Sequence, residues 1–184
     1  MKNFLLLAVA FVFFSAALQA QDKFFTKSGR INFYSKAPLE DIEARNKSAV
    51  TVLDSKAGTL QFSVLIKGFE FENAEMQEHF NEHYLESHKF PKAEFKGTIT
   101  NNSNINYASP GTYPAKTKGL LTIHGVTKEV ETTGTITVEP SGVKAVSNFN
   151  VQVADYGIKI PSLVKDKIAK TVTISVDTRL EPLK

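Results

Sequence analysis

Strict alternation of apolar and polar residues along most of the chain is the feature that most constrains its fold. Between residues 171 and 180, the apolar side chains of Val172, Ile174 and Val176 alternate with polar ones. Because successive side chains of a strand point to opposite faces, this period of two predicts a strand with one dry face and one wet face. The same rule predicts seven further strands, at residues 30–35, 42–53, 60–67, 94–100, 112–123, 126–138 and 143–153.

Turn residues separate the predicted strands. Gly58, Gly125 and Gly142 stand in short polar segments where a hairpin turn needs a positive φ angle. Eight antiparallel strands joined by mostly short connections predict an all-β fold, an eight-stranded up-and-down barrel, because closure removes exposed strand edges. A two-sheet sandwich is the alternative, and the periodicity does not separate the two.

One segment has the spacing of a helix instead of a strand. Asn73 is a good N-cap, and Met76, Phe80 and Tyr84 recur every four residues in a run that stops before Pro91. The sequence therefore predicts one short helix between the third and fourth strands. We expect these three side chains to face the barrel and to close one of its ends.

The first twenty residues have the pattern of a secretory signal peptide. Lys2 gives a basic start, an apolar run follows at residues 4–14, and small residues lead to Ala20. A membrane span needs about 20 apolar residues, which is more than this run offers. We expect cleavage after Ala20, with Ala17 as the alternative site. The mature protein is then a single domain of residues 21–184 that is exported, soluble, and periplasmic or secreted.

Composition and missing motifs exclude several functions. The 184 residues contain no Cys, which excludes disulfides, thiolate metal sites and a cysteine nucleophile. The near-balanced formal charge of +3 gives no reason to expect nucleic acid as a partner. The sequence also has no Gly-x-Ser-x-Gly elbow and no glycine-rich phosphate loop. We therefore expect no catalytic residues, no metal and no cofactor.

The histidines are the remaining candidates for chemistry. His79 and His83 stand four residues apart in a His-x-x-Glu-His string, so they share one helical face and could bind zinc with Glu82 as a base. We favour a solvated helix face over this metal-linked enzyme, because no third ligand is evident and the helix is rich in Glu. His124 precedes Gly125 and is interpreted as a turn residue that bonds its own loop.

The segment at residues 155–170 does not alternate. It combines apolar residues, among them Ile158, Ile160 and Leu163, with four lysines. Such a mixture fits a loop packed over one end of the barrel, or a surface that transiently contacts an anionic membrane. We favour the packed loop.

Three blocks of the sequence resemble the YceI-like family of secreted, lipocalin-resembling bacterial proteins. The most specific is the run Gly-Leu-Leu-Thr-Ile-His-Gly-Val-Thr-Lys at residues 119–128, and residues 76–95 and 155–158 support it. The positions that match the family's blocks are Met76, His79, Phe80, Phe90, Pro91, Phe95, Leu121, Ile123, His124, Asp155 and Tyr156. The resemblance implies a barrel that holds a polyisoprenoid or other long amphiphilic lipid, in a carrier or storage role without catalysis.

An eight-stranded barrel either is filled by its own side chains or leaves room for a slender ligand. The alternation places apolar side chains on the inner face, Val50 among them. The candidate ligand-binding residues of the walls and the helix are Phe33, Val52, Phe62, Val64, Ile66, Met76, Phe80, Tyr84, Phe90, Phe95, Ile99, Leu121, Ile123, Ile136, Val138, Phe149, Val151 and Ile174. The alternative is a solid barrel that acts as a structural or stress-response interaction protein without a ligand. The expected partner is an isoprenoid or fatty amphiphile, and the oligomeric state stays open, a dimer included.

Overall fold

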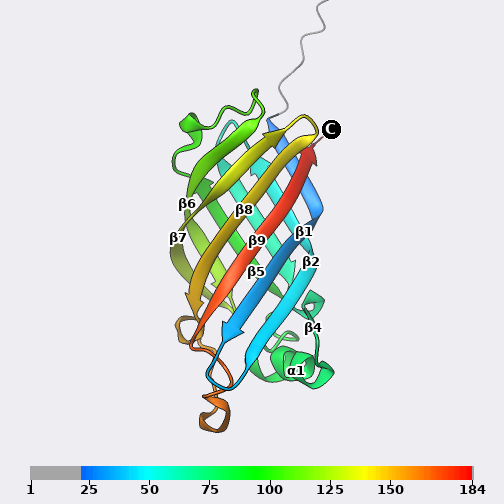
Figure 1. Ribbon diagram of the computed structural model, residues 1–184, viewed down its shortest axis with the longest axis vertical. Helices are drawn as coiled ribbons and strands as arrows, with labels where there is room; N and C mark the ends of the chain where they lie inside the picture. Colours follow the sequence, from blue (N-terminus) through cyan, green and yellow to red (C-terminus); the bar gives the residue numbers. More distant parts are fainter. Residues whose placement is uncertain (1–21, 184) are drawn as a thin grey trace, which may run out of the picture.

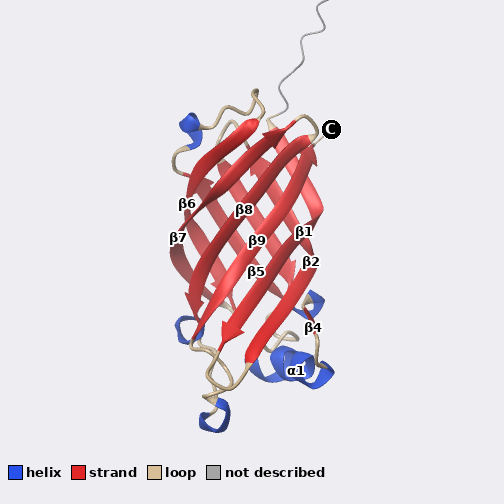
Figure 2. Ribbon diagram, in the orientation of Figure 1, coloured by secondary structure: helices blue, strands red, loops and turns tan. Residues whose placement is uncertain are grey.

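Residues 22–183, the part of the chain that the computed structural model describes, form a closed antiparallel barrel (Figures 1 and 2). Its long strands are β1 (Lys23–Lys36), β2 (Asp41–Asp54), β3 (Thr59–Leu65), β5 (Lys92–Ile99), β6 (Gly111–Ile123), β7 (Val126–Glu139), β8 (Gly142–Gln152) and β9 (Thr171–Pro182). The strands pair in the order β1-β9-β8-β7-β6-β5-β3-β2, and pairing of β1 with β2 closes the ring. The predicted eight-stranded barrel is confirmed, and the sandwich alternative is wrong. The predicted signal peptide lies outside the described residues.

The predicted helix forms between β3 and β5, but it is shorter than the sequence pattern suggests. Asn73 caps it, since Asn73 Oδ1 accepts hydrogen bonds from the amides of Glu75 (2.9 Å) and Met76 (3.3 Å). The helix α1 (Ala74–His79) then continues as a π-helical turn, Phe80–Tyr84. Within residues 22–183, no helix is long and apolar enough to cross a membrane.

Short elements complete the connections. The strand β3 ends at Leu65, two residues before the end of the predicted strand, and a 3-10 turn, Ile66–Gly68, follows it. The two-residue strand β4 (Glu70–Phe71), which the sequence did not predict, pairs with β2. Further 3-10 turns are Asn102–Asn104, Val153–Tyr156 and Ser162–Val164. The predicted turns are confirmed at Gly58, Gly125 and Gly142, which all have positive φ angles.

The two ends of the barrel differ. At the closed end, which is the upper end in Figure 1, side chains pack into a solid cluster that includes Leu53, Val143 and Leu180, each 2% exposed or less. At the opposite end, which we call the helix end, α1 and the connection between β8 and β9 lie over the strands. Because the closed end is filled, any internal space must lie toward the helix end.

In one strand, β2, the side chains that point into the barrel differ from the prediction over half of its length. In β2, Ala49, Thr51 and Leu53 are fully buried inside the barrel, whereas the positions of Val50 and Val52 face outward. The physical reason is a register irregularity against β1 between Asn46 and Ala49. The buried Asn46 side chain accepts a hydrogen bond from the Ser48 amide (2.9 Å) there, and the inward positions change from even to odd. The prediction that Val50 and Val52 face the interior is therefore wrong.

Candidate functional site

A cavity of about 560 Å³ occupies the barrel toward the helix end. Its wall is mostly apolar and is built by inward side chains of the strands, by α1, and by the connection between β8 and β9. A volume of this size lies within the range of ordinary small-molecule sites. The alternative of a barrel filled by its own side chains is wrong for this end of the molecule.

Most of the predicted candidate residues stand in the wall of this cavity. They are Phe33, Phe62, Val64, Ile66, Met76, Phe80, Tyr84, Phe95, Leu121, Ile123, Ile136, Phe149, Val151 and Ile174. Each of them follows the alternation of its strand or the four-residue spacing of the helix, except Ile66, which reaches the cavity from the turn after β3. That these side chains contact a ligand stays a prediction.

Four candidates lie outside the cavity wall. Ile99 and Val138 are buried, at 4% and 7% exposure, but they belong to the solid cluster of the closed end. Phe90 lies beyond the helix, with its ring centroid 4.7 Å from that of His124. Val52 faces outward for the reason given above. Alternation identifies the face of a strand but not the height along the barrel, which is why it included Ile99 and Val138.

Sequence reasoning missed part of the wall. Ile31, Val172 and Val176 line the cavity and follow the same alternation, so the existing pattern could have identified them. Phe69 and Phe71 also line the cavity. They stand in the turn and short strand after β3, where the sequence has no periodicity that predicts an inward position. The connection between β8 and β9 contributes Ile158, Ile160, Val164 and Ile168, which confirms the predicted packed loop.

An aromatic cluster fixes the helix against the barrel. The Phe80 ring centroid lies 5.3 Å from that of Phe33, 5.7 Å from that of Phe69 and 5.0 Å from that of Phe71. Met76 and Tyr84, on the same helix face, also line the cavity, and burial raises the pKa of the Tyr84 hydroxyl. The predicted inward orientation of this face is confirmed.

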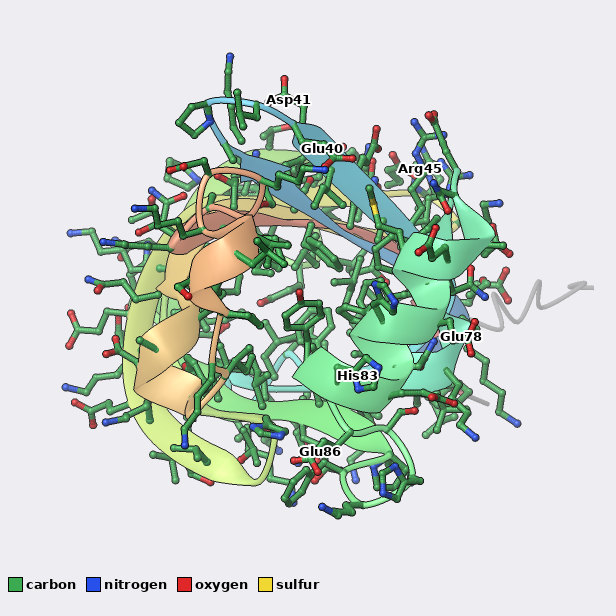
Figure 3. All side chains as sticks on the ribbon, turned by 90° about the horizontal axis from the view of Figure 1, so that it is seen from below. Glu40, Asp41, Arg45, Glu78, His83 and Glu86 are labelled. Carbon is green, nitrogen blue, oxygen red and sulfur yellow. The ribbon has the colours of Figure 1, made fainter. Side chains whose placement is uncertain are left out.

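The rim at the helix end is polar. Figure 3 shows α1 and the connection between β8 and β9 on opposite sides of this end, with Glu40 and Asp41 at the turn between β1 and β2. Glu40, Glu75 and Lys167 line the opening of the cavity. Hydrogen bonds join the connection to the turn, since the Leu39 amide donates to the Asp166 carbonyl over 3.0 Å. An apolar interior with a charged rim suits a molecule that has a long apolar tail and a polar head.

The two helical histidines lie close together, with ring centroids 5.5 Å apart. His79 reaches the cavity rim, while His83 is exposed (Figure 3). In residues 22–183, no cluster of three or more His, Asp or Glu side chains is placed to hold a metal ion. Among these residues, His79 and His83 therefore have no third ligand with which to form the zinc site of a metal-linked enzyme.

His124 has a role that the sequence did not reveal. As predicted it is a turn residue, with a φ angle of 50°, but its partners come from other loops. Its Nε2 lies 3.0 Å from Glu86 Oε2, and its Nδ1 lies 3.2 Å from the Tyr156 carbonyl oxygen. Because both partners are acceptors, both bonds form together only when the ring carries a proton on each nitrogen. The prediction that His124 bonds its own loop is wrong.

Glu86, which no sequence pattern singled out, holds this junction together. The Glu86 carboxyl accepts hydrogen bonds from Lys89 and His124. These bonds, above all the one from Lys89, keep the pKa of the carboxyl below its ordinary value. Its φ angle of 42° is unusual for a residue with a side chain. The Phe90 ring packs against the His124 ring at an interplanar angle of 73°. A Cβ at Gly125 would lie 2.5 Å from a Phe90 ring carbon, so this position needs glycine.

The three sequence blocks that carry the family resemblance therefore meet at one place beside the cavity. Phe90 comes from the first block, His124 from the second and Tyr156 from the third, and Phe90 and Tyr156 both contact His124 at the turn between β6 and β7. Their contacts with one another hold together the connections at the helix end of the barrel. The most specific sequence block thus contributes both to this junction, through His124, and to the cavity wall, through Leu121 and Ile123.

The closed up-and-down barrel and its mostly apolar cavity define a lipocalin-like fold. The chain belongs to the YceI-like domain family, whose match spans residues 12–180. No curated protein sequence gives a significant match.

Solved structures share the fold at low sequence identity. A polyisoprenoid binding domain from Saccharophagus degradans, implicated in plant cell wall breakdown, has a TM-score of 0.77 at 14% identity, over 89% of this chain and 99% of that domain. BcnA from Burkholderia cenocepacia has a TM-score of 0.66 at 16% identity, over 83% of this chain and 95% of BcnA. A YCEI protein from Campylobacter jejuni has a TM-score of 0.50 at 17% identity, over 97% and 98% of the two chains.

Proposed function

We propose that this protein binds a polyisoprenoid or a similarly long amphiphilic lipid in the barrel cavity and acts as a carrier or store, without catalysis. The observation that carries the proposal is the cavity of about 560 Å³, because its wall is mostly apolar and its opening is polar. Each ligand CH₂ that leaves water contributes roughly 0.8 kcal/mol, so a long tail binds tightly with few polar contacts. The polyisoprenoid binding domain of the same fold supports this choice of ligand class.

Lipid mass spectrometry on protein purified from its native host tests the proposal. We expect one class of long-chain amphiphile to copurify in a stoichiometric amount, and the delipidated protein to bind geranylgeraniol. Two negative results together, no stoichiometric amphiphile in native preparations and no binding of geranylgeraniol, would contradict it. A carrier role, beyond binding, requires that loaded protein delivers the lipid to acceptor vesicles.

Export is part of the same proposal. A basic start, an apolar run and small residues before Ala20 support a cleaved signal peptide and a periplasmic or secreted location. N-terminal sequencing of the protein from its host checks this directly. We expect the mature chain to begin at Gln21, or at Leu18 if cleavage follows Ala17. An intact N-terminus on protein recovered from the host would contradict the proposal.

We further propose that the connection between β8 and β9 touches an anionic membrane when lipid is exchanged. Leu163 is 92% exposed at its tip, and Leu39, on the neighbouring turn, is 72% exposed. Lys165 and Lys167 follow Leu163 by two and four residues. Apolar side chains beside lysines suit a surface of lipid headgroups with negative charge. The opposite side of the opening carries Glu75 and Glu78 of α1, which disfavour contact with an anionic surface there.

Vesicle sedimentation tests the membrane contact. The variant Leu39→Ser/Leu163→Ser is expected to lose most of its binding to vesicles that contain phosphatidylglycerol, while it still binds geranylgeraniol. Leu120→Ser is the matched control, because Leu120 is also exposed (52%) but stands on the wall of the barrel. Equal sedimentation of the double variant and the wild type would contradict the proposed contact.

A further inference from the structure

The boundary between β7 and β8 is only half paired. The backbone pairing of these strands begins at the turn, where Glu139 pairs with Gly142, and ends where Gly134 pairs with Ser147. Yet β7 continues to Val126 and pairs with β6 over that whole length, and β8 continues to Gln152 and pairs with β9. Residues 126–133 and 148–152 thus face each other without a backbone ladder. We call this unpaired stretch the seam.

Side chains close the seam where backbone bonds do not. At its upper end, Thr132 Oγ1 lies 2.9 Å from Ser147 Oγ, which donates to the Thr133 carbonyl oxygen over 2.8 Å. At its lower end, the buried Tyr156 packs in one cluster with Val130 of β7 and Val151 of β8. The seam is therefore a window bounded by a pair of hydroxyl groups above and by a tyrosine ring below.

The cavity comes close to the outer surface at this window. Thr117, Thr132 and Phe149 line the cavity, and the same three residues line a groove on the outside of the barrel. The other residues of that groove are polar and include Lys118, Glu131 and Asn148. Phe149 is the one large apolar side chain among the three residues shared by the cavity and the groove.

Parting the seam disrupts less structure than parting a paired boundary. Separating two paired strands breaks a row of backbone hydrogen bonds, whereas the seam is held by two hydroxyl bonds and by side-chain packing. At the helix end, by contrast, Phe80 packs against three other phenylalanine rings. A ligand that arrives at that end must pass beside this cluster.

We propose that the seam between β7 and β8 is a side passage by which the apolar ligand enters and leaves the cavity, with Phe149 as the side chain that moves aside. This inference rests on the proposed function, because it needs a ligand in the cavity. The polar groove outside gives the head of an amphiphile a place among charged side chains while its tail passes Phe149.

A reversible cross-link over the seam tests the passage. The chain has no Cys, so the variant Thr132→Cys/Ser147→Cys carries a single possible disulfide, between side chains that already touch. The probe is cis-parinaric acid, whose fluorescence reports binding in a stopped-flow instrument. We expect the oxidised variant to bind at least tenfold more slowly than the same variant after reduction.

The matched control is Thr122→Cys/Thr127→Cys, whose hydroxyl oxygens lie 2.8 Å apart across the fully paired boundary of β6 and β7. Its oxidation is expected to leave the binding rate unchanged. Equal rates for the oxidised and reduced seam variant would overturn the side passage while leaving the proposed function intact. Absence of binding in every variant and in the wild type would overturn the proposed function, and the passage with it.

A second variant avoids dependence on the disulfide. Phe149→Ala removes the ring that lines both the cavity and the groove, so we expect both association and dissociation of cis-parinaric acid to become several-fold faster. A wild-type dissociation rate in a folded Phe149→Ala protein would also overturn the side passage.

Discussion

Filling the cavity from one wall position should weaken ligand binding by an amount that the structure defines. Val64, 6% exposed, stands in the wall and pairs across β3 and β5 with Ala93, a small neighbour that leaves room for a larger ring. The substitution Val64→Phe adds about four carbons, which exclude about four ligand carbons from the cavity. At roughly 0.8 kcal/mol each, the loss is about 3 kcal/mol, or an increase of about 200-fold in the Kd for geranylgeraniol.

The assay is displacement of cis-parinaric acid by geranylgeraniol, with urea unfolding in parallel. Val52→Phe is the matched control, since it makes the same substitution on the same barrel at an outward position, and its Kd should equal that of the wild type. Overpacking can cost about 1–3 kcal/mol of stability, and the urea curves separate that cost from lost binding. A folded Val64→Phe protein with wild-type affinity would refute the assignment of the cavity as the ligand site.

Three further outcomes are expected. Because the folded-state pKa of Glu86 lies below its ordinary value, its contribution to stability is present above that value and lost as the pH falls through the folded pKa. Glu86→Gln should therefore lower the urea midpoint at pH 7, and its difference from the wild type should shrink as the pH falls. A Cβ at Gly134 would lie 2.2 Å from the Val146 carbonyl oxygen, so Gly134→Ala should lower the free energy of unfolding by about 1–3 kcal/mol, and an unchanged urea midpoint would contradict this. Burial raises the pKa of Tyr107 to about 12, so this side chain stays mostly neutral at about pH 11, and wild type and Tyr107→Phe should show equal phenolate absorbance there. The stability that the neutral Tyr107 hydroxyl contributes should fall as the pH rises above about 10, where the unfolded chain begins to lose this proton.

The sequence predicts this fold well because the main signal is local. In β9, the inward positions of Ile174 and Val176 follow from a period of two that any half-buried strand must show. The helix was located for a similar reason, since Asn73 caps it and Phe80 continues its apolar face. Its length was not predicted, because the change to a π-helical turn at Phe80 depends on packing against the barrel.

The parts that failed depend on contacts between distant residues. The inward face of β2 changes where Asn46 and Ser48 interrupt the register, and alternation read along a single strand gives no sign of that change. The junction of Glu86, His124 and Tyr156 joins three loops that are far apart in the chain. No spacing in the sequence indicates that Glu86 and His124 are partners, so only the three-dimensional structure shows this.

The first and last strands of the described chain are bonded to each other, and this has a consequence for the order of folding. β1 pairs with β2 along one side and with β9 along the other, so the ring has two free strand edges until residues 171–182 arrive. A nascent chain that lacks these residues exposes backbone groups ready to bond with another copy. Productive folding must therefore wait for the C-terminal segment, and loss of that segment should turn a closed barrel into an aggregating sheet.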